Sequence, residues 1–266
     1  MKIFSSLKKI KKNFNDTLKP VLNKNHADLK KLKGIHAGQR AFVIGTGPSL
    51  QISDLDHLQN EVTFSCNKIY LSFTETEWRP TYYSVIDTVV AENNAEKIKK
   101  LRVKKIFSNS VKKYFLNSTD ILWHDDLKTK IIDGRRQQDF SRNLLRGTYG
   151  GHTVIFTILQ IAYYMGIRDI YLLGIDFSFT NPKETAGKTA SGEVLLKNEG
   201  EVNHFHPDYR KEGELWTMPR LDIQHEAFTA ARDVFEKSGG RILNASRSTK
   251  LDVFPLVCFD EIPFKK

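Results

Sequence analysis

The chain has 266 residues, of which 40% are hydrophobic and 27% are charged, which suits one large folded domain and excludes a largely disordered protein. Its formal net charge is +10, but residues 1–33 hold ten lysines against two aspartates, so the remainder is nearly balanced and no nucleic-acid partner is indicated. Two cysteines, Cys66 and Cys258, provide no disulfide framework, so a reducing, cytoplasmic compartment is expected.

The first 36 residues form a basic extension. Apolar residues from Ile3 to Leu18 recur at helical spacing with lysines between them, which predicts a basic amphipathic helix. Such a helix can lie on the anionic inner face of a membrane, or it can pack as a solvated helix on the domain or on a partner chain. The segment lacks the apolar core of a secretory signal, and no stretch approaches the ~18 apolar residues of a membrane span. We therefore expect a cytoplasmic protein and leave peripheral membrane attachment open.

Residues 37–266 alternate short strand-like runs with helical patterns. The predicted strands are 41–45, 62–66, 82–86, 104–108, 169–174 and 241–245, with 120–124 as a weaker seventh. The predicted helices are 89–101, 153–165 and 222–237, and Pro48 is placed to begin another helix. This alternation predicts one α/β domain with a mostly parallel sheet and helices on both faces.

The predicted strands end repeatedly in small polar or acidic residues. Because the carboxyl ends of parallel strands share one edge, and open α/β folds bind ligands there, these residues predict a functional carboxyl edge. Asp87 and Asp176 each end a strand, where a carboxylate can hold a metal, bind a sugar hydroxyl or cap the next element. Hydroxyl binding or a structural hydrogen bond is favoured over a paired metal site.

A glycine loop follows the first predicted strand and consists of Gly45, Thr46, Gly47, Pro48 and Ser49. Glycines let backbone amides approach a phosphate, and a helix N-terminus favours the anion. The third glycine of the dinucleotide fingerprint is Leu50 here, and Asn67 stands where an acidic residue would bind an NAD ribose. No Walker lysine follows, so both the NAD and P-loop interpretations are disfavoured. A nucleotide phosphate site and a ligand-free tight turn remain.

A second glycine turn precedes the helix predicted at 153–165. Gly150 and Gly151, followed by a predicted N-cap, can bind an anion or a carbonyl group, and His152 can face that ligand. Simple capping of the helix is the alternative. Asn67 likewise can bind a nucleobase or sugar hydroxyl, or it can cap a turn.

Residues 177–221 lack periodicity and predict an irregular lid over the site. The tail of this segment holds His204, His206 and Tyr209 in an aromatic cluster, which favours an ordered lid. Histidine titrates near neutral pH and can take a proton from an acceptor hydroxyl. Metal binding by the two histidines is disfavoured because no third ligand stands at a convincing spacing.

Five motifs in this order, "GTGPSL", "CNKIY", the glycine turn, "IYLLGIDFSF" and "NHFHPDY", carry a resemblance to known proteins. Over residues 38–256 the chain resembles the bacterial lipooligosaccharide sialyltransferases of glycosyltransferase family 42. It resembles more closely the domain family named for 6-hydroxymethylpterin diphosphokinase, which includes domains of flagellin-glycosylating proteins. The resemblance implies a modified Rossmann-like, nucleotide-binding α/β fold.

The resemblance also implies site residues and a reaction. Sialyltransferases use CMP-sialic acid without requiring a metal, although Mg²⁺ remains an option, and a lid histidine removes the acceptor proton in an inverting displacement. Carried over, this chemistry assigns CMP contacts to Gly45, Gly47, Ser49 and Asn67. It assigns the leaving phosphate to Tyr171 and the base role to His204 or His206, with Asp176 near the donor and Asp87 and Tyr209 near the sugar or acceptor.

The chain departs from the sialyltransferase pattern at three places. Thr46 replaces the asparagine of the glycine loop, Ser178 stands for the second tyrosine at the leaving group, and Gly150, Gly151 and His152 replace a Thr-Ser-Gly turn. These positions are assigned to the donor site with Pro48. The departures affect the identity of the sugar more than glycosyl transfer itself.

Three functions follow as hypotheses. The first is a glycosyltransferase that moves an acidic sugar of the nonulosonic type from a CMP-activated donor to a surface glycan or glycolipid. The second is a Mg-ATP-dependent diphosphokinase that acts on a small hydroxymethyl compound. The third is a non-catalytic nucleotide-binding module, which would not require the histidine-rich lid. Association of the chain with copies of itself is left open.

Overall fold

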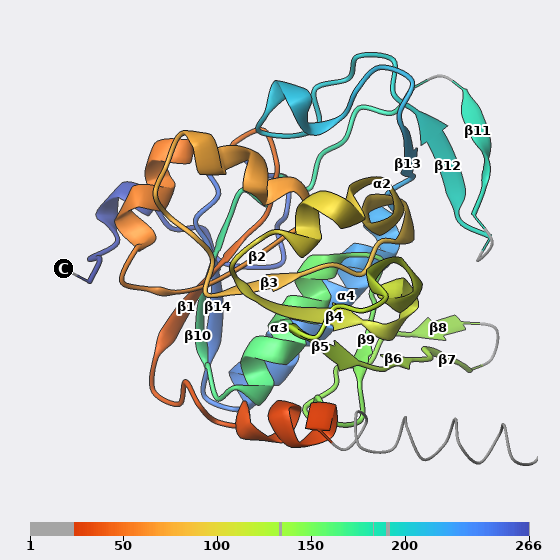
Figure 1. The fold of residues 1–266 in the computed structure, drawn as a ribbon. Coiled ribbons are helices and arrows are strands. Elements are labelled where there is room, and N and C mark those ends of the chain that lie inside the picture. The colour runs from red at the N-terminus through yellow and green to blue at the C-terminus, as the bar shows by residue number, and fades with distance from the viewer. Residues whose placement is uncertain (1–23, 133–134, 183, 190–191, 266) are drawn as a thin grey trace, which may run out of the picture.

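The computed structural model describes residues 24–132, 135–182, 184–189 and 192–265 and contains a seven-stranded sheet (Figure 1). Its strands are β1 (Arg40–Ile44), β2 (Val62–Cys66), β3 (Tyr82–Ser84), β4 (Lys104–Ser108), β5 (Ile121–His124), β10 (Asp169–Leu173) and β14 (Arg241–Asn244). The strand order is β14-β10-β1-β2-β3-β4-β5, and every neighbouring pair is parallel. All seven predicted strands are therefore confirmed.

Helices cover both faces of this sheet, as the sequence predicted. One face carries α3 (Val154–Tyr164) and α4 (Leu221–Lys237), and the other carries α2 (Thr88–Lys99) with the 3₁₀ helices η1 (Ile52–Leu58), η2 (Asn67–Thr74) and η3 (Asn109–Phe115). Strand β1 shows the reason, because Ala41 and Val43 pack into the first layer while Phe42 and Ile44 pack into the second. The fold is a modified Rossmann-like α/β fold.

The sheet reverses its direction of growth between β1 and β10. From β1 the chain builds outward through β2, β3, β4 and β5, then returns to lay β10 on the other side of β1. Parallel sheets bind their ligands at the carboxyl ends of the strands beside such a reversal. The glycine loop after β1 and the turn after β10 lie at this point.

The segment 177–221 is more regular than predicted. It contains a three-stranded antiparallel sheet of β11 (Thr185–Lys188), β12 (Val194–Lys197) and β13 (Leu215–Thr217), and a 3₁₀ turn, η4 (Pro207–Tyr209). The prediction that this segment is irregular is wrong, because β12 pairs with a strand that begins 18 residues after β12 ends, which local periodicity does not reveal. Strand β13 lies against α2, so this small sheet sits beside the carboxyl edge (Figure 1).

Smaller elements complete the fold. Strand β6 (Asp126–Leu127) pairs with β9 (Thr148–Tyr149), β7 (Lys130–Ile132) pairs with β8 (Arg135–Gln137), and a short turn η5 (Phe259–Glu261) lies near the C-terminus. Strands of two or three residues carry too little periodicity to be predicted.

The basic extension is described only in part. Residues 24–31 are helical, whereas the whole of the amphipathic helix predicted from Ile3 to Leu18 lies outside the described residues. Within the described part of the chain, no helix combines the length and the apolar character that crossing a bilayer would need.

Candidate functional site

Two cavities meet at the carboxyl edge of the sheet. The larger, which we call the main cleft, measures about 430 Å³ and lies between the ends of β2, β3 and β4, the start of α3 and the lid. The smaller, the side cavity, measures about 140 Å³ and lies beside the glycine loop and the end of β10. Asn67, Thr153 and His204 line both, so the two cavities are contiguous.

The structure brings most of the predicted site residues to these cavities. Those that line the main cleft are Asn67, Asp87, Gly150, Gly151, His152, His204 and Tyr209. Those that line the side cavity are Gly45, Thr46, Gly47, Asn67, Asp176, Ser178 and His204. Those that line neither are Pro48, Ser49, Tyr171 and His206.

The glycine loop binds the side chain of Asp176 from the same chain. The Ser49 amide donates to Asp176 Oδ2 at 2.8 Å, and the Ser49 hydroxyl donates to Oδ1. Burial raises the pKa of the Asp176 carboxyl, and the two bonds from Ser49 oppose that rise. Residues 48–49 form a turn, and the next helix is the 3₁₀ helix that begins at Ile52, so the predicted helix start at Pro48 is wrong. In this structure Ser49 bonds to Asp176, so its predicted contact with a ligand phosphate stays a prediction.

The glycines of this loop are required by the approach of β1 to β10. The Gly45 and Gly47 amides donate to the carbonyls of Leu173 and Gly174 at 2.8 and 2.9 Å, which extends the parallel ladder beyond the strands. A Cβ at Gly45 would lie 2.5 Å from the Gly174 oxygen, and one at Gly47 would lie 2.7 Å from Asp176 Cγ. The packing of this loop against the end of β10 therefore accounts for both glycines without a bound ligand.

We expect Gly45→Ala to lower the free energy of unfolding by about 1–3 kcal/mol, because the new methyl group meets a backbone carbonyl that cannot rotate away. Gly150→Ala is the matched control, since a Cβ there meets no atom within 4 Å. Urea unfolding of both variants measures the effect. Equal stability of the two would contradict a packing role for Gly45.

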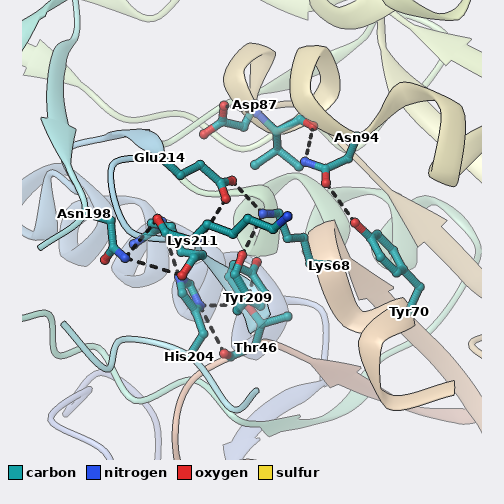
Figure 2. Close-up of polar contacts among 12 residues, drawn as sticks. Thr46, Lys68, Tyr70, Asp87, Asn94, Asn198, His204, Tyr209, Lys211 and Glu214 are labelled. Atoms are coloured by element: carbon teal, nitrogen blue, oxygen red, sulfur yellow. Dashed lines mark hydrogen bonds and ion pairs between the residues drawn. The ribbon is translucent and has the colours of Figure 1, made fainter. Parts of the chain in front are cut away.

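His204 joins the glycine loop to the lid. Its Nδ1 donates to the Thr46 carbonyl at 3.1 Å, and its Nε2 accepts from Arg210 Nη2 at 3.1 Å. The ring also stacks on Tyr209 with centroids 3.6 Å apart (Figure 2 shows His204 beside Thr46 and Tyr209). Burial, reinforced by the charge of Arg210, lowers the pKa of His204 to about 3. With both ring nitrogens bonded in this way, the imidazole is better placed to hold Arg210 than to take a proton, so the structure does not favour the predicted base role of His204.

The hydrogen bond to His204 holds the guanidinium group of Arg210 in position. It lines the main cleft, and its guanidinium carbon lies 4.0 Å from the centre of the Trp216 ring. Arg210 Nη1 and Trp216 Nε1 are both buried without a hydrogen-bond partner among the described residues. A buried donor left unpaired costs about 1–3 kcal/mol, so these two groups favour a ligand that brings acceptor oxygens into the cleft.

Lys68 supplies a second cation beside Arg210. Its Nζ donates to the Tyr209 carbonyl at 2.6 Å and lies 2.6 Å from Glu214 Oε1, contacts that Figure 2 shows. Burial lowers the pKa of the ammonium group, and Glu214 opposes the shift. Lys68 therefore lies in the same cleft as Arg210, where Glu214 balances its charge.

Asn67 occupies the junction of the two cavities. It adopts a left-handed conformation with φ of 49°, and its carbonyl accepts a bond from the Tyr83 hydroxyl. Its Oδ1 is buried and has no partner among the described residues. An amide oxygen in this state can accept a bond from an amino or hydroxyl group of a ligand, which agrees with the predicted role.

The second glycine turn has the predicted form. Gly151 and His152 both have positive φ, 54° and 55°, and Thr153 caps α3 by accepting from the Ile155 amide. A Cβ at Gly151 would lie 2.8 Å from Ala227 Cβ, so close packing requires this glycine. The N-terminus of α3 thus points its positive end at the cleft.

The carboxylates of the main cleft already have partners. Asp87 Oδ1 caps α2 by accepting from the Val89 and Val90 amides at 2.7 and 3.1 Å. Both oxygens of Asp126 accept from the Ser108 hydroxyl, at 2.7 and 2.6 Å. Among the described residues, no three or more His, Cys, Asp or Glu side chains form a group suited to a metal ion. Asp87 therefore caps α2, and its contact with a sugar or an acceptor stays a prediction.

Three further predicted residues have structural roles. His206 Nδ1 accepts from the Asp208 amide at 3.0 Å and caps η4 outside both cavities, a position that does not favour its predicted role as base. Tyr171 is corrected to a core residue, since it lies in mid-strand and stacks on Phe42 with centroids 5.1 Å apart. The hydroxyl of Tyr209 accepts from Thr46 Oγ1 at 3.1 Å inside the protein.

The residues that sequence analysis missed are Lys68, Arg210 and Trp216. Lys68 and Arg210 each adjoin a residue that was predicted, in "CNK" and "DYR", but a charged residue beside a polar one carries no separate signal. Their burial follows from contacts between the lid and the sheet edge, which no local pattern reports.

The fold and the cleft define an α/β protein with a polar site, lined by charged residues of both signs, at the carboxyl edge of a parallel sheet. The chain belongs to the 6-hydroxymethylpterin diphosphokinase MptE-like family, whose family model matches residues 6–182. This confirms the resemblance seen in the motifs.

A solved structure of a MAf glycosyltransferase from Magnetospirillum magneticum AMB-1 has a TM-score of 0.53 over 92% of this chain, at 15% sequence identity. The chain spans 39% of the length of that protein, and at this identity the similarity establishes a shared fold. No curated protein sequence matches the chain significantly.

Proposed function

We propose that the chain is a cytoplasmic glycosyltransferase that moves an acidic sugar of the nonulosonic type from a CMP-activated donor to a glycan or glycolipid acceptor. The observation that carries this proposal is the buried guanidinium of Arg210, which has an unpartnered Nη1 in the main cleft. Lys68 lies in the same cleft, so the site suits a donor with two anionic groups, a phosphate and a sugar carboxylate. The shared fold with a glycosyltransferase is consistent with this activity.

The proposed donor lies across the junction of the two cavities. Asn67 Oδ1 would accept from the amino group of the cytosine base, which would place the phosphate toward Arg210 and the start of α3. Arg210 and Lys68 would stabilise the charge that develops on CMP as its bond to the sugar breaks. The acceptor oxygen would attack the opposite face of the anomeric carbon and invert its configuration.

The alternative is a Mg-ATP-dependent diphosphokinase, which the description of the matched family favours. Two cations and a helix N-terminus would also suit a triphosphate. Mg²⁺ would need carboxylate ligands, and Asp87 and Asp126 are the aspartates that line the cleft. However, Asp87 Oδ1 and both oxygens of Asp126 already accept hydrogen bonds from the protein. The residues therefore fit a magnesium clamp poorly, and we assign no step to the ion.

Thermal denaturation with nucleotides separates the two functions. CMP at 100 times its dissociation constant would stabilise the protein by about 2.7 kcal/mol, which raises Tm by roughly 5–10 °C for a chain of this size. We expect CMP and CMP-sialic acid to produce such a shift and ATP with Mg²⁺ to produce none. A shift with ATP and Mg²⁺ alone would select the diphosphokinase, and nucleotide binding without CMP release from CMP-sialic acid would select a binding module.

A further inference from the structure

Glycosyl transfer requires a group that accepts the proton of the acceptor hydroxyl, and neither lid histidine is placed to do so. His204 holds the Thr46 carbonyl with one ring nitrogen and Arg210 with the other. His206 caps η4 and lines neither cavity. The base must therefore come from another element of the cleft.

His152 lines the main cleft from the floor. Its backbone is fixed, because its φ of 55° follows the tightly packed Gly151 and its carbonyl accepts from Gln224 Nε2 at 2.9 Å. Thr153 then begins α3 directly. The imidazole is thus attached to a rigid turn, which suits a group that must meet a substrate atom at a defined position.

Glu193 reaches this histidine from the lid. Its Oε1 lies 3.7 Å from His152 Nδ1, and Glu193 lines the same cleft. Glu193 belongs to the turn between β11 and β12, where its carbonyl accepts from the Thr189 amide at 2.8 Å. The pair therefore connects the turn before α3 with the lid. The other charged residues that line this cleft are Lys68, Asp87, Asp126, Arg210 and Glu214.

We propose that His152 is the general base of the transfer and that Glu193 positions it, an inference that rests on the proposed function. The Glu193 carboxylate faces Nδ1 and favours the tautomer whose lone pair is on Nε2. The acceptor proton passes to Nε2 while the acceptor oxygen bonds to the anomeric carbon. The bond from that carbon to the CMP phosphate oxygen breaks, and CMP leaves with the electron pair. His152 was predicted to bind the donor, and the proposed role instead places it beside the acceptor.

CMP release from CMP-sialic acid tests the inference. We expect His152→Gln to lower kcat by 100-fold or more while the CMP dissociation constant stays within threefold of wild type. Glu193→Gln is expected to lower kcat about tenfold and to move the acidic limb of the kcat profile to lower pH, since the imidazolium loses a negative neighbour. A purely structural role for Glu193 would not move that limb. His225→Gln, at an exposed histidine paired with Asp252 outside the cleft, is the control.

The outcomes separate this inference from the proposed function. A wild-type protein that neither binds CMP nor releases it from the donor overturns both. A wild-type protein that does both, with His152→Gln turning over within threefold of its rate, overturns the base assignment alone. If His152→Gln fails to fold, the pH profile of Glu193→Gln decides, and an unmoved acidic limb counts against the pair.

Discussion

Replacing Arg210 by alanine is expected to weaken binding of CMP-sialic acid by about 10- to 100-fold, because a hydrogen bond to a charged group contributes about 1.5–3 kcal/mol. The guanidinium lies over Trp216, receives its orientation from His204 and presents a buried Nη1 that lacks a partner among the described residues. Isothermal titration of wild type and variant with CMP-sialic acid and with CMP measures the loss. An equal loss for both ligands assigns Arg210 to the phosphate, and a loss confined to CMP-sialic acid assigns it to the sugar carboxylate.

Two variants control this experiment. Arg210→Lys keeps the charge but loses the planar contact with Trp216, so an intermediate affinity is expected. Arg232→Ala removes an arginine that pairs with Asp233 on α4, outside both cavities, and should bind the donor as wild type does. Donor affinity within twofold of wild type in Arg210→Ala would contradict an anion site at this residue.

The sheet was predictable because its strands are buried on both faces. In such strands a continuous apolar run followed by a polar residue marks both the strand and its carboxyl end, as in β2 and β4. The position of the cleft followed from the same observation, since Asn67, Asp87 and the Gly150–Thr153 turn all come after strands or before a helix. Strand ends, turns and helix starts are set by residues close in sequence, so the sequence alone could locate them.

The roles of the polar residues at that edge were not predictable, since each role depends on a distant partner. Ser49 was assigned to a ligand phosphate, but its partner is Asp176, which lies 127 residues away in the chain. His204 and His206 are two residues apart, yet one contacts the glycine loop and the other caps η4. Spacing alone does not distinguish a side chain that meets a ligand from one that meets another part of the protein.

Thr46 shows how the lid and the glycine loop form one unit. Its carbonyl accepts from the Phe205 amide and from His204 Nδ1, both at 3.1 Å. The carbonyl between the two glycines thus anchors the segment that carries Arg210. We infer that the loop contributes to binding by fixing the lid, and that the donor phosphate is met by side chains of the lid and of η2.

The last expected result concerns His204, whose substitution by glutamine should reduce kcat/KM without removing an ionisation from the pH–rate profile. The glutamine amide oxygen can still accept from Arg210, so His204→Gln should retain more activity than His204→Ala. A base with a pKa of about 3 would not be limiting between pH 5 and 9, so the acidic limb should stay in place. Loss of that limb in His204→Gln would restore His204 as the base and remove His152 from that role.

The stability of the same variant provides an independent test. The pKa of His204 is depressed by folding, so between pH 6.5 and about 3 the unfolded chain binds a proton that the folded protein does not. The contribution of His204 to stability is therefore present above pH 6.5 and is lost as the pH falls, with a limiting slope of about 1.4 kcal/mol per pH unit. His124 is also buried with a lowered pKa and adds a slope of the same sign, so the difference between wild type and His204→Gln isolates one residue. Urea unfolding from pH 4 to 8 should show a shallower pH dependence in His204→Gln, whereas parallel curves would mean that His204 has the same pKa in the folded protein as in the unfolded chain and could take part in proton transfer.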